Sequence, residues 1–488
     1  MKYEVVIGLE VHAELKTCSK MFCACPVVDA ARVEPNSAVC PVCAGMPGAL
    51  PVVNRGAVEL GLRAALALEC QIAPTSLFAR KNYFYPDLPK GYQISQYEYP
   101  MAENGRLVVE TGSGERLIRI RRVHLEEDTG KLTHVQKPDG ESYSLVDLNR
   151  AGMPLLEIVS EPDLGSIEDV RAYAMGLRAV LRSVEASSAD MEKGQIRFEA
   201  NLSLRLPGRH ELGTRVEIKN LNSFRALEKA IAFEIDRQAA VLTAGKKVIQ
   251  ETLGWDESEG VTISQRSKEE AHDYRYFPEP DLPPLVVEPE WIEAIKNALP
   301  ELPLARKRRL QREHNLSSAE AALMISDPSG ADFFEECAGA ARGEIAARTI
   351  ANWISGPMFG WLNHTGERFE QVKIQPQALV DLLHMLARAQ ITHNTAKSVL
   401  NEMLANGRSA AEIINERGLL QVSDPQVISG MVTRVLNENP RELSAYLKGK
   451  ETLSNWFFGQ VMRIAGGTAN PELLRVELQK QLDRMKTH

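Results

Sequence analysis

The chain has 488 residues, of which 44% are hydrophobic and 25% are charged, and its formal net charge at pH 7 is -8. This composition is ordinary for a globular chain, and no stretch approaches the roughly 20 consecutive apolar residues of a membrane span, so an integral membrane protein is not expected. The acidic balance argues against a general nucleic-acid coat, although it leaves room for a local basic face on one domain.

The first predicted element is a strand over residues 2–12, where apolar and other side chains alternate. Side chains two residues apart on a strand point to the same side, so one face of this strand is apolar. That face is formed by Tyr3, Val5, Ile7, Leu9 and Val11. Glu10 and His12 lie side by side on the opposite face, which therefore carries an acid next to a base.

A cluster of cysteines follows, with the pattern CxC, fourteen intervening residues and CxxC. Two such pairs supply four soft thiolates in the arrangement that tetrahedral zinc prefers, so a structural zinc ion is predicted. The predicted ligands are Cys23, Cys25, Cys40 and Cys43. A vestigial site and ordinary thiols are the alternatives, and Cys18 is a possible substitute ligand.

The use of cysteine also indicates a compartment. Only seven cysteines occur in the chain, and their early clustering is unlike an extracellular disulfide framework. The first ten residues do not resemble a secretory leader. A reduced, cytoplasmic location is therefore expected.

Three later segments repeat the alternation of the first strand. In residues 118–128 the even positions place His124 and Glu126 on one face. Residues 196–205 and 215–219 follow the same rule on either side of a turn, so they are predicted to form an antiparallel hairpin. The polar faces of this hairpin carry Arg197, Glu199, Asn201, Ser203, Arg205, Arg215, Glu217 and Lys219.

Two interpretations of these polar faces are open. In the first, each face simply meets water, as in many antiparallel sheets that pack on one side. In the second, the four strands share one concave site, because they carry Glu, His, Asn and Arg with few of the Thr, Ser and Lys residues common on solvated strands. The second interpretation predicts a cradle lined by acid and base, and it explains the whole set more economically.

Two loops have a composition suited to a nucleotide. The chain has no GxxxxGK[ST] phosphate loop and no GxGxxG between a strand and a helix, so any ATP must be held by strand side chains and loops. Residues 81–100 and 266–284 both mix Lys or Arg with aromatic residues and proline, which can hold phosphates and stack on rings. Rigid structural loops whose tyrosines fill their own base are the alternative.

The chain changes character near residue 285, after a proline-rich segment. Before it, strand alternation and glycine turns dominate; beyond it, apolar residues recur every three or four positions, which predicts helices. Asn406-Gly407 and Gly418 are predicted helix stops. The expected fold is α+β, a mainly antiparallel β cradle with flanking helices followed by two helical domains. The expected limits are 1–290 for the cradle with its zinc-binding insertion, 291–408 for a helical linker domain and 409–488 for a helical tail.

Six segments closely resemble the B subunit of the tRNA-dependent amidotransferase, the GatB type. They occur in the family's order and read IGLEVHAELKT, KNYFYPDLPKGYQISQ, HLEEDTGK, DLNRAGMPLLEIVSEPD, GTRVEIKNLNSFRALEKAI and DYRYFPEPDLPP. The segments TAKSVLNEML and GQVM followed by ANP are similar to the family's tRNA-binding tail. The resemblance therefore covers nearly the whole chain.

The resemblance implies a reaction on glutamate or aspartate wrongly attached to the tRNA of the matching amide, tRNA(Gln) or tRNA(Asn). In this family the B subunit uses ATP and Mg²⁺ to phosphorylate the side-chain carboxylate, and ammonia from an amidase partner, the A subunit, then displaces the phosphate. A small C subunit completes a heterotrimer. The chain itself shows no convincing nucleophilic Ser or Cys arrangement, so it is expected to lack glutaminase activity alone.

The resemblance also carries roles onto particular residues. His12, Glu126 and Glu157 match the magnesium site, and Glu10 and Glu217 line the same cradle. The residues expected near the nucleotide or the acceptor end are Lys81, Tyr83, Lys90, Tyr92, Arg197, Glu199, Asn201 and Lys219. Two positions depart from the family pattern, because Glu199 stands where Asp is usual and Leu253 where Arg is frequent.

Two rival functions are open. The chain could be a zinc-stapled tRNA-binding protein without catalysis, but RNA surfaces avoid the carboxylate cluster expected here. It could also be a ligase that uses free ammonia and small amino acids, which would give the helical tail no purpose. The choice between Glu-tRNA(Gln) and Asp-tRNA(Asn) depends on the synthetases of the host.

Overall fold

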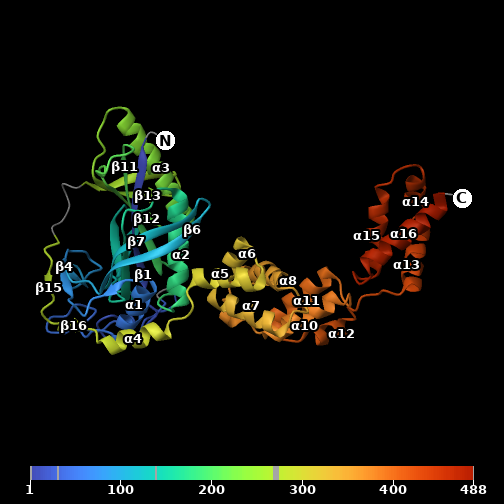
Figure 1. Ribbon diagram of the computed structural model, residues 1–488, viewed down its shortest axis with the longest axis horizontal. Coiled ribbons are helices and arrows are strands. Elements are labelled where there is room, and N and C mark those ends of the chain that lie inside the picture. The colour runs from blue at the N-terminus through green and yellow to red at the C-terminus, as the bar shows by residue number, and fades with distance from the viewer. Residues whose placement is uncertain (1–2, 30–31, 138–139, 268–273, 487–488) are drawn as a thin grey trace. The chain divides into compact units, whose positions relative to one another are not determined.

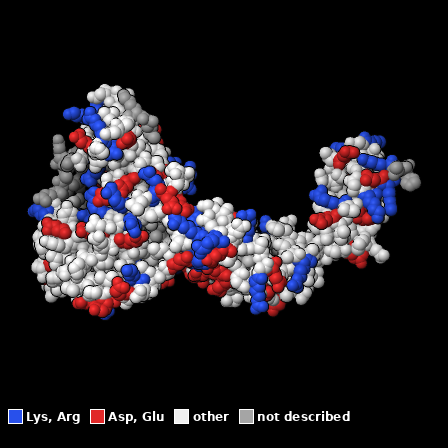
Figure 2. All heavy atoms as spheres, in the orientation of Figure 1, with Lys and Arg blue, Asp and Glu red and all other residues white. Residues whose placement is uncertain are grey.

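The computed structural model describes residues 3–29, 32–137, 140–267 and 274–486. The chain forms two compact units, residues 1–306 and residues 307–488 (Figure 1). Among the described residues, no helix is both long and apolar enough to cross a membrane. On the face shown in Figure 2, basic and acidic side chains are interspersed over the N-terminal unit.

The N-terminal unit is built on a twelve-stranded sheet with the order β14-β13-β12-β11-β1-β10-β7-β5-β4-β15, and β6 pairs with both β7 and β2. All pairings are antiparallel except that between β12 and β13. The strands of this sheet are β1 (Glu4–Glu14), β2 (Gln71–Ile72), β4 (Ala79–Asn82), β5 (Tyr92–Ser95), β6 (Ala102–Thr111), β7 (Gly114–Glu127), β10 (Pro154–Ser160), β11 (Ile196–Arg205), β12 (Val216–Leu221), β13 (Glu251–Asp256), β14 (Val261–Ser267) and β15 (Phe277–Pro278). Two small separate sheets pair β3 (Thr75–Ser76) with β16 (Leu285–Val286) and β8 (Lys131–Gln136) with β9 (Ser142–Asp147).

Three helices pack against the apolar side of this sheet: α1 (Arg55–Ala67), α2 (Ile167–Ser183) and α3 (Phe224–Thr243). Each begins at a polar residue whose side chain accepts hydrogen bonds from the free N–H groups of the first turn. These residues are Asn54, Ser166 and Ser223. Helix α4 (Pro289–Ala298) adds Ile295 to the same hydrophobic core. Because the helices lie on the apolar side, the polar side of the central strands stays open.

The predicted alternation is confirmed in the central strands. Leu9 and Val11 of β1 are fully buried, whereas Glu10 and His12 are only partly buried. The predicted hairpin is also confirmed, since β11 and β12 pair antiparallel, and Val216 of β12 is buried. The fold class is confirmed as well, because this sheet with its flanking helices is followed by a helical region.

The C-terminal unit consists of helices around two hydrophobic clusters, one from Leu310 to Ile414 and one from Ile428 to Leu482. The predicted stops are confirmed, because Gly407 and Gly418 both adopt the left-handed conformation at a helix end. The domain limits at 290 and 408 stay predictions. The helices are α5 (Pro303–His314), α6 (Ser318–Met324), α7 (Pro328–Ala340), α8 (Ala347–Trp353), η2 (Ile354–Met358), α9 (Phe359–Thr365), η3 (Phe369–Gln371), α10 (Pro376–Ala387), α11 (His393–Asn406), α12 (Ala410–Arg417), α13 (Pro425–Glu438), α14 (Pro440–Leu447), α15 (Leu453–Ile464) and α16 (Pro471–Lys486).

Leu9 offers a test of the apolar side of β1. The substitution Leu9→Ala leaves a cavity under the sheet and is expected to lower the free energy of unfolding of the N-terminal unit by about 2–5 kcal/mol. Leu117→Ala, on a half-exposed position of β7, is the control and should cost about 0.5 kcal/mol or less. Urea denaturation followed by circular dichroism measures both, and equal losses would contradict the assignment of faces.

Candidate functional site

The open side of the sheet contains a cavity of about 600 Å³. The wall is predominantly polar and charged, and it is built by strands and loops that are distant in sequence. Its lining residues are Glu10, His12, Lys81, Tyr83, Gln93, Ser95, Gln96, Tyr97, Arg122, His124, Glu126, Asp128, Thr129, Leu155, Glu157, Arg197, Glu199, Arg215, Glu217, Lys219, Gln250, Glu251, Thr252, Tyr274 and Tyr276. The interpretation as one shared cradle is thus favoured over separate water-facing strands.

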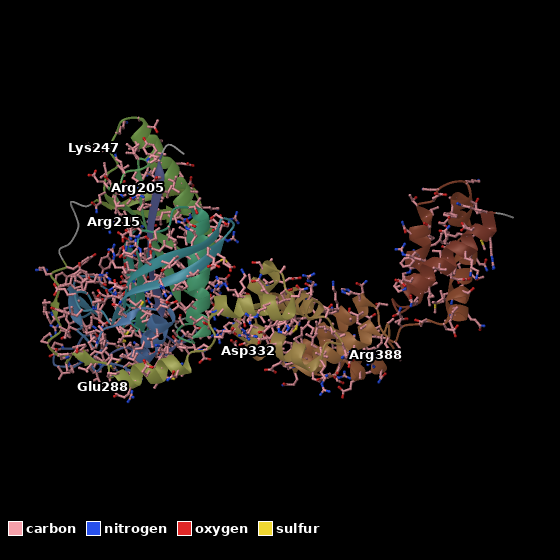
Figure 3. All side chains as sticks on the ribbon, viewed as in Figure 1. Arg205, Arg215, Lys247, Glu288, Asp332 and Arg388 are labelled. Atoms are coloured by element: carbon pink, nitrogen blue, oxygen red, sulfur yellow. The ribbon has the colours of Figure 1, made fainter. Side chains whose placement is uncertain are left out.

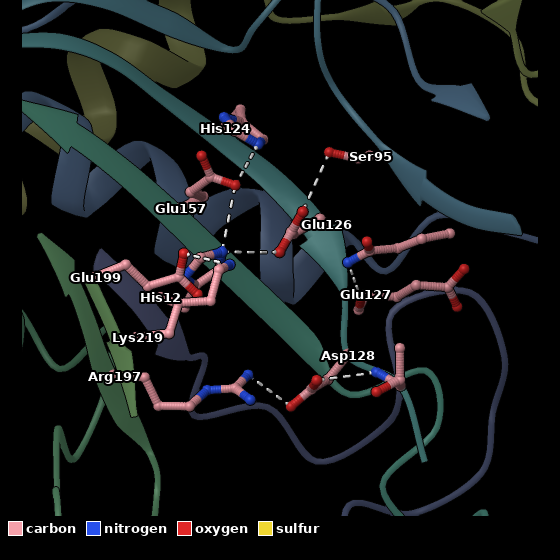
Figure 4. A network of polar contacts seen from close by, with 12 residues as sticks. His12, Ser95, His124, Glu126, Glu127, Asp128, Glu157, Arg197, Glu199 and Lys219 are labelled. Atoms are coloured by element: carbon pink, nitrogen blue, oxygen red, sulfur yellow. Dashed lines mark hydrogen bonds and ion pairs between the residues drawn. The ribbon is translucent and has the colours of Figure 1, made fainter. Parts of the chain in front are cut away.

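A row of side chains crosses the floor of this cavity on three neighbouring strands. His12 of β1 lies opposite Glu157 of β10, and Glu157 lies opposite His124 of β7. The Nε2 atoms of both imidazoles are 3.3 Å from the same carboxylate oxygen, Oε2 of Glu157. Figure 4 shows the carboxylate of Glu157 between the two rings. The antiparallel register therefore produces a carboxylate held from both sides.

Glu126 completes the group around His12. Its Oε1 is 3.5 Å from Nε2 of His12, and its Oε2 accepts a hydrogen bond of 3.2 Å from Ser95 (Figure 4). One ligand atom from each of His12, Glu126 and Glu157 lies within 4.8 Å of the others. Two carboxylates and an imidazole converging in this way fit a divalent cation that prefers oxygen ligands.

The ionisation of His12 follows from its neighbours. Burial by itself lowers the pKa of His12, but the hydrogen bond to Glu157 and the charges of Glu157 and Glu126 outweigh burial and raise the pKa to about 9. The same contacts, together with His124, hold the pKa of Glu157 well below its usual range despite burial. A proton on His12 therefore neutralises the carboxylates in the way that a cation would.

A second group of carboxylates lies on β1 and on the two strands at its other side, β11 and β12. One ligand atom from each of Glu10, Glu199 and Glu217 lies within 4.8 Å of the others. The ammonium of Lys219 is 2.8 Å from Glu199 and 3.3 Å from Glu217, and Asn201 donates a 2.9 Å hydrogen bond to Glu10. Glu199, whose side chain is one methylene longer than the Asp usual in the family, thus reaches the cluster. Burial first, and then the nearby carboxylates, raise the pKa of Glu10.

The residues expected at the nucleotide divide into two groups. Lys81 and Tyr83 line the cavity, and the Lys81 ammonium is 5.9 Å and 5.1 Å from the ring centres of Tyr83 and Tyr274. Burial alone lowers the pKa of Lys81, but the charge of Glu126 and other nearby groups raises it overall. Lys90, Tyr92 and Asn201 are not among the described lining residues.

Lys90 and Tyr92 instead lie behind the wall. The ammonium of Lys90 pairs with Glu127 and is 5.6 Å from the ring centre of Tyr92. Glu127 in turn accepts a hydrogen bond of 3.0 Å from the backbone N–H of Ile94. The structure therefore brings this pair close to the cavity but not to its surface.

The loops of the cavity mouth are aromatic, as expected. Tyr97 and Tyr276 stack with ring centres 4.1 Å apart and an interplanar angle of 9°. Residues 268–273 of the second predicted loop lie outside the described residues. Tyr274 and Tyr276 at the end of that loop line the cavity.

Arg122, Asp128 and Arg215 also line the cavity, although no motif gave them a role. The strand parity that places His124 and Glu126 in the cradle also includes Arg122 and Asp128, so alternation alone could have found them. Asp128 accepts a 2.8 Å hydrogen bond from Arg197, which locates the predicted Arg197 at one end of the cavity (Figure 4). Arg215 lies on the chain just before β12, and Figure 3 places it on the N-terminal unit.

The four cysteines of the predicted zinc site converge in the structure. One sulfur from each of the four lies within 4.8 Å of the others, and the sulfur of Cys43 is 3.9 Å from those of Cys25 and Cys40. Sulfurs bound to tetrahedral zinc at about 2.3 Å are about 3.8 Å apart, so the spacing fits the metal. Cys18 is not part of this group among the described residues.

A buried lysine stands beside the sulfurs. Lys20 is fully buried, and its ammonium donates to the carbonyl of Ala38 at 2.8 Å and lies 3.6 Å from the sulfur of Cys43. The backbone N–H of Cys40 also points to this sulfur at 3.2 Å. These positive groups offset the negative charge that four thiolates bring to a zinc ion.

Comparison with known protein families shows the family to which the chain belongs. A family model described as the GatB/GatE catalytic domain matches residues 5–293, and one described as the GatB domain matches residues 332–482. The chain belongs to the GatB/GatE family.

Known relatives agree along the whole chain. The B subunit of the aspartyl/glutamyl-tRNA(Asn/Gln) amidotransferase of Moorella thermoacetica is 50% identical over 482 residues, which are 99% of this chain and 100% of that protein. The protein of the same name from Thermodesulfovibrio yellowstonii is 48% identical over 97% of this chain and 98% of its own length. That from Thermomicrobium roseum is 48% identical over 99% of each.

The predicted zinc site can be tested by metal content and stability. We expect about one zinc per chain, since four thiolates close a structural site. Cys43→Ser should lose the metal and lower the melting temperature, because metal binding and folding are coupled. Cys18→Ser is the matched control and should keep both. Elemental analysis and thermal unfolding measure the two effects, and a metal-free wild-type chain of full stability would contradict the site.

The proton on His12 predicts how the cation site responds to pH. Below pH 9 the imidazole binds a proton that a metal ion must displace, so affinity should rise with pH. The dissociation constant of Mn²⁺ for the metal-free full chain should fall about tenfold per unit between about pH 7 and pH 9. Electron paramagnetic resonance measures free Mn²⁺. His12→Asn should bind more weakly without this slope, and a pH-independent affinity of the wild type would contradict the assignment.

Proposed function

We propose that this chain is the subunit that activates and amidates glutamate on tRNA(Gln), aspartate on tRNA(Asn), or both. ATP phosphorylates the side-chain carboxylate, and ammonia from a partner amidase then replaces the phosphate. The observation that carries the proposal is the group formed by His12, Glu126 and Glu157 on the floor of one large polar cavity. The shared name of the relatives, each the B subunit of an aspartyl/glutamyl-tRNA(Asn/Gln) amidotransferase, supports the substrate class.

The chemistry has two steps. A carboxylate oxygen of the aminoacyl group bonds to the γ-phosphorus of ATP, and the bond from that phosphorus to the leaving ADP oxygen breaks. The lone pair of ammonia then attacks the acyl carbon to form the C–N bond. The bond from that carbon to the phosphate oxygen breaks, and phosphate leaves. Phosphoryl transfer depends mainly on positioning and on neutralising the charge of the transferring group.

The residues of the cavity supply these functions. His12, Glu126 and Glu157 fit Mg²⁺, which when bound neutralises charge on the phosphates. The carboxylate of Glu157 is fixed between His12 and His124, so its orientation is set before substrate arrives. The Lys81 ammonium lies over tyrosine rings and lines the same space, where it is placed to meet an anionic phosphate.

Ammonia must arrive without a proton, since NH₄⁺ has no lone pair for attack. Glu10 is suited to take that proton, because burial and neighbouring carboxylates raise its pKa and make it a stronger base than an ordinary carboxylate. Lys219 lies among the same carboxylates and keeps Glu199 ionised. We assign Arg197 and Asn201 to positioning, through their hydrogen bonds to Asp128 and Glu10.

The proposal includes partners that the chain needs. Ser95 and Thr252 line the cavity, but their hydroxyls donate to the carboxylates of Glu126 and Glu217, and no described imidazole accepts from them. We therefore expect glutamine hydrolysis in a separate amidase, the A subunit, with a small C subunit in a heterotrimer. The helical tail, residues 409–488, is the expected tRNA-binding part. The reduced thiols of the proposed zinc site fit a cytoplasmic assembly.

A tRNA-binding protein without catalysis is the rival function. It is disfavoured because Glu10, Glu126, Glu157, Glu199 and Glu217 all line the same cavity. Such a concentration of carboxylates repels an RNA backbone unless a cation stands between them. The rival predicts tRNA binding with no turnover of ATP.

Substitution of the floor carboxylates tests the proposal. In the assembly purified with its partner subunits, Glu126→Gln and Glu157→Gln should each lower ATP turnover dependent on misacylated tRNA by about 100-fold or more, because each removes charge from the cation site. Glutamine hydrolysis by the partner should persist in the absence of tRNA. The measurements are ADP release and amidated tRNA.

The matched control is Glu103→Gln, which removes an exposed carboxylate on β6 and should keep full activity. Unchanged turnover in Glu126→Gln and Glu157→Gln would show that the assigned site is wrong. Assays with Glu-tRNA(Gln) and Asp-tRNA(Asn) side by side separate the two substrates.

A further inference from the structure

Arg122 occupies a place in the cavity wall for which the reaction so far has no use. It lies on β7 two residues before His124 and four before Glu126, so all three side chains project from the same face of the strand. It lines the cavity, and its side chain is 26% exposed. A partly exposed arginine in a polar cavity has donors available to a ligand.

The guanidinium of Arg122 has unused hydrogen-bonding capacity. Its one ion pair with a described residue is to Oε1 of Glu157 at 3.6 Å, which is longer than a hydrogen bond. Its Nε is buried and has no hydrogen-bond partner among the described residues. Two other cations of the cavity are already engaged, since Arg197 donates to Asp128 and Lys219 to Glu199, both at 2.8 Å.

The need to neutralise the charge of Glu157 does not explain why Arg122 stands in the cavity wall. Glu157 already has an imidazole on each side, with the nitrogens of His12 and His124 at 3.3 Å from Oε2. A guanidinium serving as its main partner would make two short, parallel hydrogen bonds to the carboxylate. The longer approach leaves the N–H groups of Arg122 for another acceptor.

A cation–π contact with Tyr97 helps to hold the guanidinium in place without using those N–H groups. Its central carbon is 5.5 Å from the ring centre of Tyr97, and Tyr97 stacks on Tyr276 at 4.1 Å. A cation–π contact restrains a guanidinium through its charge and leaves its N–H groups free to donate to another acceptor. Arg122 is thus oriented before any ligand binds, which lowers the entropic cost of binding an anion.

We propose that Arg122 is a phosphate-binding catalytic residue, whose guanidinium donates to oxygens of the phosphoryl group as it passes from ATP to the aminoacyl carboxylate. The inference deepens the proposed function and rests on it. In this step the bond from the γ-phosphorus to carboxylate oxygen forms and the bond to ADP breaks, while Arg122 remains protonated throughout. The planar fork of arginine matches the paired oxygens of a phosphoryl group.

The charge of the cavity floor explains why such a cation is needed. The carboxylates of Glu126, Glu157 and Glu199 face the space that a triphosphate must enter. An anion approaches them only where positive groups offset the repulsion. Arg122 stands beside Glu157 with its charge not fully engaged, so it lies where the transferring group meets the cation site.

The test compares Arg122 with its neighbour Arg121, which pairs with Glu161 at 2.8 Å and lies outside the cavity. In the full assembly with ATP and misacylated tRNA, Arg122→Gln should lower kcat/KM for ATP by about 100-fold. Arg122→Lys should recover only part of this, because an ammonium lacks the planar fork. Arg121→Gln and Arg121→Lys should stay within about twofold of the wild type.

Two further measurements separate the possible causes. Binding of ATPγS to the full chain, by calorimetry, should weaken about tenfold in Arg122→Gln and not in Arg121→Gln. The Mn²⁺ affinity and melting temperature of Arg122→Gln should match those of Arg121→Gln. A loss of Mn²⁺ affinity as large as the loss of turnover would overturn the proposal, since Arg122 would then act through Glu157.

Equal turnover and equal ATPγS affinity in Arg122→Gln and Arg121→Gln would also overturn it. If the wild-type assembly itself shows no ATP turnover with misacylated tRNA, the proposed function fails. The ATPγS comparison still decides the role of Arg122 in that case, because it measures binding to the chain directly: weaker binding in Arg122→Gln supports the phosphate contact, and equal binding overturns it.

Discussion

The carboxylate of Glu157, shared by two imidazoles, is the contact on which the cavity floor depends. It exists because β1, β10 and β7 pair in one antiparallel register, with His12, Glu157 and His124 directly opposite one another. A slip of β10 by one residue would turn Glu157 to the helix-covered side and replace it with an apolar neighbour. The apolar residues of the same strands prevent that slip, because they are buried against α1, α2 and α3. The hydrophobic core thus fixes the chemistry on the other side of the sheet.

The alternation of side chains put Glu10, His12, Glu126 and Glu199 on polar faces, where they line the cavity, and it predicted the β11–β12 hairpin. It could not predict which strands lie side by side, since His12 and Glu157 are 145 residues apart and meet only through the topology of the sheet. Nor could alternation reveal Glu157 itself: β10 reads PLLEIVS and is buried along its length, so no period of two is visible. Glu157 came from the family resemblance.

The segment of Lys90 and Tyr92, a loop that leads into β5, shows a second limit of the sequence. Its composition and the family resemblance both suggested a nucleotide contact for these two residues. In the structure Lys90 pairs with Glu127, and neither Lys90 nor Tyr92 is among the described lining residues, so their contact with a nucleotide stays a prediction. Lys90 lies in the irregular part before β5, where no fixed period indicates which side chains face inward.

The cysteine cluster is tied to the strand that carries Glu157. Lys20, beside Cys43, also donates to the carbonyl of Leu148 at 3.2 Å, and the N–H of Met21 donates to the carbonyl of Gly152 at 2.7 Å. Both carbonyls belong to the segment that leads into β10. A metal at the cysteines would therefore stiffen the start of this strand as well as its own loop. Through this link, the proposed zinc would influence the cavity without any contact with substrate.

Each carboxylate cluster of the cavity has its own built-in counter-ion: the imidazolium of His12 in one, the ammonium of Lys219 in the other. A divalent ion that bound at either cluster would therefore replace a positive charge already there rather than enter a group of unpaired carboxylates. In each cluster a positively charged side chain offsets the mutual repulsion of the carboxylates.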